Sequence, residues 1–296
     1  MLLSDKSIRM QLWVNRLAER PSAWKIWYCV LALIALMLGS QVTLLLQVAN
    51  DLVGHEHVKN ILENAAPPFQ FVGFSILSLI FIRLATKKWP TVEELGLTPR
   101  ITLKDLALIL VVFLVTHAFF MLISMGVDTS AQAEKLFDEL GLNHGFAYSL
   151  PLVVSSVILA PICEELLYRG IMLRCVHDAL IRQGFLIMAP AISLALSSLF
   201  FALPHLGGAL LDRMSLAYIL TGLAFGFVYI RTGSLTAAMV SHSLQSCFAF
   251  SNVLLYGRGE TAVSPFLYLL VFGCPVWTYL SAKALWLLLP KEQPSA

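Results

Sequence analysis

Two adjacent glutamates, Glu164 and Glu165, follow an apolar stretch of the chain and lie just before Arg169. Glu165 and Arg169 are four residues apart with the acid first, which is the favourable order for an ion pair on a helix. Glu164 lies on a helix face rotated by about 100°, so no local cation neutralises it. Such a carboxylate can take a proton from water and act as a general base. The other interpretation is a solvated charge cluster at the end of a helix.

Two histidines could join this pair from other helices. His205 ends a later apolar segment, and His242 lies inside another one. Glu164 and His205 are 20 and 21 residues from Gly184, which marks a turn between them, so their side chains would be level in an antiparallel hairpin. Three ionisable groups on separate helices predict a functional site at membrane depth. A single histidine there, such as His117, is more often a packed core residue.

The elements that position these residues must be membrane-spanning helices, because the composition does not suit a soluble fold. Of 296 residues, 58% are hydrophobic and 13% are charged, whereas a soluble domain has about a quarter charged residues. A spanning helix needs roughly 20 apolar residues. We predict an all-α, polytopic membrane protein with about eight transmembrane helices, over residues 26–48, 69–85, 106–125, 146–167, 185–203, 214–230, 235–255 and 265–289.

The positions of lysine and arginine predict the orientation of these helices. Short cytoplasmic loops collect both residues, and sixteen of the 20 would lie on one side of the membrane. We therefore expect a multi-pass protein of the cell membrane with both termini in the cytoplasm and the site near that side. The helical segment that follows the two glutamates carries further ionisable residues. They predict that this segment runs along the bilayer surface or protrudes from it; they are Arg169, Arg174, His177, Asp178 and Arg182.

Connecting segments and cysteines complete the pattern. Thr91-x-x-Glu94 has the spacing of a capping box and predicts a short interfacial helix. Residues 130–140 predict an amphipathic helix on the outer surface. The five cysteines are isolated and predict no disulfide framework. No basic tract is dense enough to hold nucleic acid, which we exclude as a partner.

The order and spacing of these residues resemble the three motifs of the CPBP family. This family comprises type II CAAX prenyl proteases and bacterial bacteriocin-processing or self-immunity (Abi-like) proteins. The resemblance covers roughly residues 150–247 and divides the chain into an N-terminal three-helix membrane region (1–145), a CAAX-protease-like core (146–256) and a C-terminal transmembrane helix (257–296). The motifs are Glu164-Glu165-x-x-Tyr168-Arg169-Gly170, then Phe201-x-x-x-His205, then His242.

The resemblance implies an eight-helix membrane peptidase with its cavity between the motif helices. It implies that Glu164 activates a water molecule and that Glu165 and Arg169 support it. It also implies that His205 and His242 stabilise the tetrahedral intermediate or help to position the water.

One position departs from the family pattern. The third motif usually has asparagine four residues after the histidine, where this chain has Ser246. An asparagine amide would donate a hydrogen bond to the developing oxyanion, and losing one such donor lowers the rate on the order of a hundredfold. Ser246 therefore makes peptidase activity a weaker expectation than membership of the family.

The sequence leaves metal dependence open. Glu164, His205 and His242 could hold zinc or another divalent metal, with water as a further ligand. The same three groups could act without metal, and the HExxH spacing of the usual zinc peptidases is absent. We favour the metal-free glutamate mechanism and expect no cofactor.

Three functions are compatible with this pattern. The first is an intramembrane endopeptidase that hydrolyses a peptide bond near the membrane surface, in a peptide or membrane-protein substrate and in contact with lipid. The alternative is a catalytically weak or inactive family member that acts through a membrane protein partner in immunity or sensor regulation. A transporter could also use intramembrane glutamate and histidine, but no inverted repeat supports it.

Overall fold

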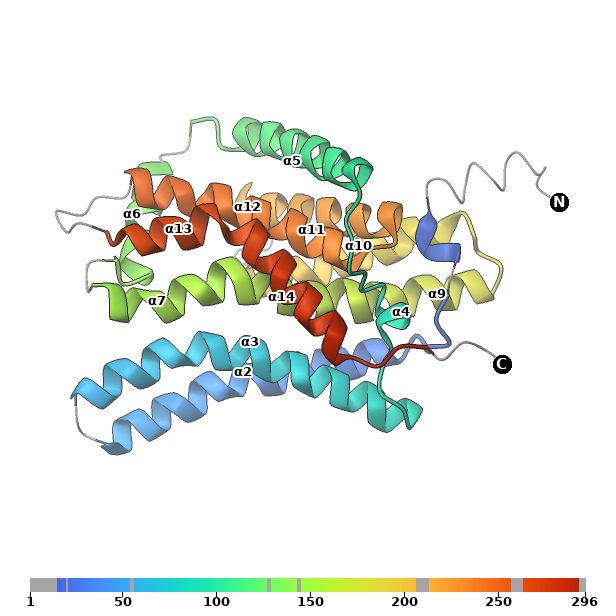
Figure 1. Ribbon diagram of the computed structural model, residues 1–296, viewed down its shortest axis with the longest axis horizontal. Helices are drawn as coiled ribbons and strands as arrows, with labels where there is room; N and C mark the ends of the chain where they lie inside the picture. Colours follow the sequence, from blue (N-terminus) through green and yellow to red (C-terminus); the bar gives the residue numbers. More distant parts are fainter. Residues whose placement is uncertain are drawn as a thin grey trace.

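The computed structural model in Figure 1 describes residues 15–19, 21–53, 56–126, 129–142, 145–205, 213–256 and 263–292. Every element within these ranges is a helix, and none is a strand. The predicted all-α class and the multi-pass membrane character are therefore confirmed.

The first part of the chain consists of a short helix, a long hairpin and three further helices. These elements are η1 (Arg16–Glu19), α2 (Tyr28–Val53), α3 (Glu56–Thr86), α4 (Val92–Leu95), α5 (Leu103–Ile123) and α6 (Thr129–Glu139). The two predicted connecting helices are confirmed as α4 and α6. Both hydrogen bonds of the capping box between Thr91 and Glu94 are present.

One unbroken helical stretch follows and carries the two glutamates. It consists of α7 (Phe146–Val154), η3 (Ser155–Leu159), α8 (Ala160–Glu165), η4 (Leu166–Leu173) and α9 (Arg174–Arg182). The segments η3 and η4 are π-helical, so a wider helical turn lies on each side of the glutamates. Such π-helical turns are rare and often occur at functional sites.

The remaining elements supply the two histidines and close the bundle. They are α10 (Met188–Ala202), η5 (Leu203–His205), α11 (Arg213–Thr232), α12 (Leu235–Tyr256), α13 (Pro265–Phe272) and α14 (Cys274–Leu288). In Figure 1 the α2–α3 hairpin lies along one side of the bundle and α5 along the opposite side. The glutamate helix packs against α3, α10 and α12 between them.

The structure supports six or seven spans, and the predicted count of about eight is not confirmed. In the part of the chain that the structure describes, six helices are long and apolar enough to cross a membrane, or seven if α13 and α14 form one span bent by 64°. The predicted seventh span, α12, is not among them because serines, His242 and Gln245 lower its hydropathy. The bend between α13 and α14 lies at Gly273 and just before Pro275, which cannot donate a backbone hydrogen bond.

The helical segment that follows the two glutamates differs from the prediction in the environment of its charged residues. Helix Phe146–Arg182 has 37 residues, which at 1.5 Å per residue gives about 55 Å. This exceeds the hydrocarbon thickness of about 30 Å, so the helix extends past it unless it is strongly tilted. However, the charges are not solvated, because Arg174, His177 and Asp178 are buried and bonded inside the protein. Burial against the N-terminal segment, rather than exit into water, explains these charges.

Small residues bring α10 and α11 close together. A methyl group at Gly222 would lie 3.0 Å from the Cα atom of Ser198, and one at Gly226 would lie 2.4 Å from Leu194 Cδ1. The absence of side chains on this face lets the two helix backbones approach. It also leaves the Gly222 carbonyl accessible to the arginine of the glutamate helix.

Candidate active site

The predicted ion pair between Glu165 and Arg169 is present and fully buried. Arg169 Nη1 donates to Glu165 Oε1 over 2.8 Å. Arg169 Nη2 donates to the Gly222 carbonyl over 2.9 Å, which fixes the guanidinium against α11. The guanidinium carbon also lies 4.5 Å from the centre of the Phe201 ring. Three helices therefore hold one charged pair in place.

His242 forms a hydrogen bond with Glu165 and not with Glu164. Its Nδ1 lies 2.9 Å from Glu165 Oε1, and because a carboxylate only accepts, Nδ1 is the donor. The carboxylate that pairs with Arg169 therefore also binds the histidine. The ring stacks on Phe225 at a centroid distance of 4.5 Å, which fixes its orientation and leaves Nε2 as the only ring nitrogen without a partner in the described residues.

Glu165 and Arg169 still have unused polar atoms. Glu165 Oε2 and Arg169 Nε are buried without a hydrogen-bond partner in the described part of the protein. A buried polar atom without a partner typically costs about 1–3 kcal/mol. The cluster is thus held in place but incompletely satisfied, as is common where a water molecule or substrate group binds.

His205 lies at the end of α10, in the short helix η5. Its Nδ1 donates to the Phe201 carbonyl over 2.9 Å, so in the neutral ring Nε2 is the acceptor nitrogen. The imidazole stacks on Tyr218 at 4.7 Å and lies 5.1 Å from the Phe201 ring. The ring is half-buried, and within the described ranges Nε2 has no partner.

Phe201 contacts residues of all three motif helices, a role that its place in the Phe201-x-x-x-His205 motif did not predict. Its ring contacts both histidines, with centroid distances of 5.1 Å to His205 and 5.8 Å to His242. It also packs edge-on against Tyr168 at 5.5 Å. The only sequence signal was that Phe201 precedes His205 by one helical turn. Phe225 and Gly222 gave no signal, because their contacts depend on how α11 packs.

Glu164 and Ser246 are the two candidate residues without polar partners. Each is 9% exposed, and neither side chain makes a hydrogen bond or ion pair within the described ranges. Glu164 thus differs from its neighbour Glu165, which has two partners. A carboxylate without a hydrogen-bond partner beside a fixed glutamate–arginine–histidine cluster is able to act as a general base.

The residues do not form a metal-binding group. Among the residues with described positions, no three His, Cys, Asp or Glu side chains lie close enough together to hold a metal ion.

The class of protein follows from these observations. The chain is a multi-pass membrane protein in which a buried glutamate and arginine from one helix and a histidine from another lie beside a glutamate without a hydrogen-bond partner in the described residues. Residues 146–248 match the family described as type II CAAX prenyl endopeptidase, Rce1-like. The match covers the region that resembles the CPBP family and supports the predicted family for this domain. The match contains all six candidate residues. No curated protein and no solved structure matches the chain.

Proposed function

We propose that this protein is an intramembrane endopeptidase that hydrolyses a peptide bond near the membrane surface with water activated by Glu164. The observation that carries the proposal is the contrast between the two glutamates. Glu165 is fixed by Arg169 and His242 at 2.8 and 2.9 Å. Glu164 is adjacent, slightly exposed and without a polar partner in the described chain.

In this mechanism Glu164 removes a proton from water, and the oxygen attacks the carbonyl carbon of the substrate peptide bond. The bond between carbon and nitrogen then breaks, and the proton passes to the leaving amine. Glu165 and Arg169 support Glu164 by keeping the helix and His242 in position. His205 and His242, each with an unused Nε2, position the water or stabilise the tetrahedral intermediate.

The test uses the full chain in liposomes with candidate peptide substrates, including prenylated CAAX peptides. Glu164→Gln should lower the rate of hydrolysis on the order of a hundredfold or more, because it removes the general base but keeps the shape. His205→Ala should also lower it strongly. His117→Gln is the matched control, because His117 is a histidine of the helical bundle that stacks on Phe113 and packs edge-on against Phe248, and it contacts none of the candidate site residues. Equal processing by Glu164→Gln, His205→Ala and wild type would exclude the peptidase.

We also propose that the protein lies in the cell membrane with both termini in the cytoplasm. The excess of lysine and arginine on one side supports this orientation. The first and last described segments lie at the same end of the bundle in Figure 1, where Arg16 and Trp286 line one cavity. Reporter fusions after residue 296 and before residue 1 should both be active in the cytoplasm, and an active periplasmic or external reporter at either end would contradict the orientation.

Ser246 favours a second candidate, a catalytically weak member that acts through a membrane protein partner. Its hydroxyl makes no hydrogen bond in the described chain and stands where the family usually has an amide. Ser246→Asn should raise hydrolysis by about tenfold if a missing oxyanion donor limits the rate. A phenotype that persists in Glu164→Gln would favour the partner role.

A further inference from the structure

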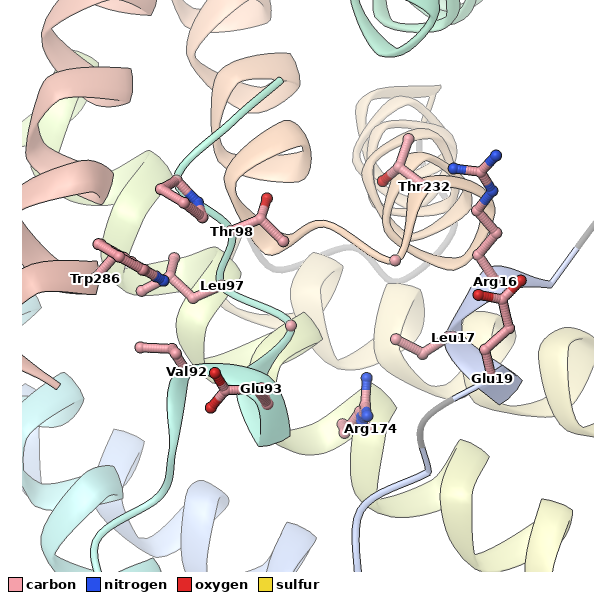
Figure 2. A pocket seen from close by; sticks show the side chains of 13 residues that line it. Arg16, Leu17, Glu19, Val92, Glu93, Leu97, Thr98, Arg174, Thr232 and Trp286 are labelled. Atoms are coloured by element: carbon pink, nitrogen blue, oxygen red, sulfur yellow. The ribbon is translucent and has the colours of Figure 1, made fainter. Parts of the chain in front are cut away.

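A polar cavity lies at one end of the bundle, apart from the candidate active site. It has a volume of about 380 Å³ and opens between η1, the residues after α4, the α11–α12 turn and the end of α14. Figure 2 shows side chains from all of these segments around one space. None of the six candidate site residues lines it.

The walls of this cavity are fixed by bonds between distant parts of the chain. Thr98 Oγ1 lies 2.7 Å from Ser234 Oγ, and the Leu235 N–H donates to the Gly96 carbonyl over 2.7 Å. The Val92 N–H donates to the Pro290 carbonyl over 2.9 Å, which fixes the residue after α14. The cavity is therefore a built feature of the folded protein.

The charges in the cavity are balanced. Arg16 and Arg174 supply two cations, and Glu19 and Glu93 supply two acids. Arg174 is buried, is held by Asp178 at 2.7 Å, and in Figure 2 its guanidinium points toward the middle of the cavity. A ligand with one anionic and one cationic group matches these walls better than a simple anion or cation.

The cavity lies at the level where the membrane ends. The span Ser215–Thr232 ends in its wall, and Trp286 lines it. Tryptophan is enriched at the boundary between hydrocarbon and headgroups. Strongly exposed leucines follow the lining residues in sequence, with Leu103 84% and Leu288 82% exposed. Acyl chains can lie against such a surface while a headgroup enters the cavity.

We propose that this cavity binds the headgroup of a zwitterionic glycerophospholipid with a primary ammonium group, such as phosphatidylethanolamine. The phosphate binds Arg16 and Arg174, because guanidinium groups bind phosphate with paired hydrogen bonds. The ammonium donates to Glu93 and Glu19. A primary ammonium has three hydrogen-bond donors, whereas the quaternary ammonium of a choline headgroup has none, so the acids select against choline. This site is independent of the proposed peptidase activity.

The test measures lipid binding to the purified full chain by native mass spectrometry. The probes are dioleoyl phosphatidylethanolamine, phosphatidylcholine and phosphatidylglycerol. Wild type should retain phosphatidylethanolamine on the order of tenfold more tightly than the other two lipids. Arg16→Ala should weaken its binding by about tenfold, and Glu93→Gln should remove the preference over phosphatidylcholine. Arg100→Ala is the matched control, because Arg100 is exposed at the same end of the bundle but does not line the cavity.

A competition with soluble glycerophosphoethanolamine separates the two sources of this headgroup. Displacement of the lipid at similar concentrations would assign the site to the headgroup alone, and failure to displace would assign it to the whole lipid; both support the zwitterion site. Equal binding of all three lipids, or equal loss in Arg16→Ala and Arg100→Ala, would overturn the proposal. Thermal unfolding of each variant without lipid shows whether a loss of binding comes from misfolding.

Discussion

Two buried charged clusters lie on the same helix, and their hydrogen bonding differs. In the cluster around Asp178, the carboxylate accepts from Arg174, from His177 and from the Ser22 N–H at 2.6–2.7 Å, and His177 also contacts Asn15. In the cluster around Glu165, one carboxylate oxygen serves both Arg169 and His242, while the other has no partner in the described chain.

This difference separates a structural cluster from a candidate site. The Asp178 cluster uses its charges to fasten the segment before α2 to α9, and Arg182 adds bonds to the carbonyls of Ser22 and Trp24. The polar atoms of Asp178 and His177 form hydrogen bonds with other residues of the protein. The Glu165 cluster keeps polar atoms unused and has the unpaired Glu164 beside it. Both clusters bury charge, so burial does not distinguish them. The difference is that the Glu165 cluster has buried polar atoms without hydrogen-bond partners in the described chain.

The largest effect on stability is expected at Arg169. Arg169→Met leaves Glu165 charged and buried without its cation, which should lower the free energy of unfolding by about 3–5 kcal/mol. Detergent-titration unfolding in mixed micelles measures it. Lys135→Met is the control, because the Lys135–Glu139 pair is exposed and should change stability by less than about 1 kcal/mol. Equal effects of the two variants would mean that the buried pair contributes no more than a surface pair.

A smaller effect on stability, with the site chemistry intact, is expected at Asp178. Asp178→Asn keeps the shape but removes the charge that Arg174 and His177 share, which should cost about 2–3 kcal/mol. Hydrogen exchange at Ser22 should become faster, because its N–H loses a charged acceptor. Hydrolysis by the folded fraction should stay at the wild-type rate. A loss of activity without a loss of stability would contradict the division between the two clusters.

Packing at Gly222 tests the link between α11 and the site. Gly222→Ala places a methyl group 3.0 Å from Ser198 Cα, and overpacking of this kind costs about 1–3 kcal/mol. It should also lower hydrolysis, because the Gly222 carbonyl holds Arg169. Gly73→Ala is the matched control, since its nearest neighbour would lie at an ordinary 3.8 Å. Equal stability and activity of both variants would show that α11 does not position the arginine.

The smallest effect is expected when the two cluster histidines are compared. His177→Gln removes an imidazole ring from a satisfied hydrogen-bond network and should lower the free energy of unfolding by about 1 kcal/mol without changing the rate of the folded enzyme. His242→Gln should change stability by a similar amount but lower the rate. Hydrolysis rates and free energies of unfolding are measured for both variants. An equal fall of the hydrolysis rate in His177→Gln and His242→Gln would contradict the distinction between the two clusters.

Much of the site could be predicted because it depends on local geometry or on hydrophobicity. Four-residue spacing was sufficient for the Glu165–Arg169 pair and for the capping box of α4. Apolar length was sufficient for most of the helices, although α12 shows its limit, since a helix that carries polar residues loses the hydropathy signal. The order of the short motifs predicted the family, and the match at residues 146–248 supports it for that region.

The sequence by itself determined the all-α membrane class, the local ion pair and the identity of the residues able to carry chemistry. Only the tertiary structure decided which glutamate His242 binds, that Phe201 joins the motif helices, and that the charges around Asp178 are buried instead of solvated. The physical reason is that these properties depend on contacts between residues tens to more than a hundred positions apart. Helical periodicity fixes which residues share a face of one helix, but the packing of several helices fixes which faces meet.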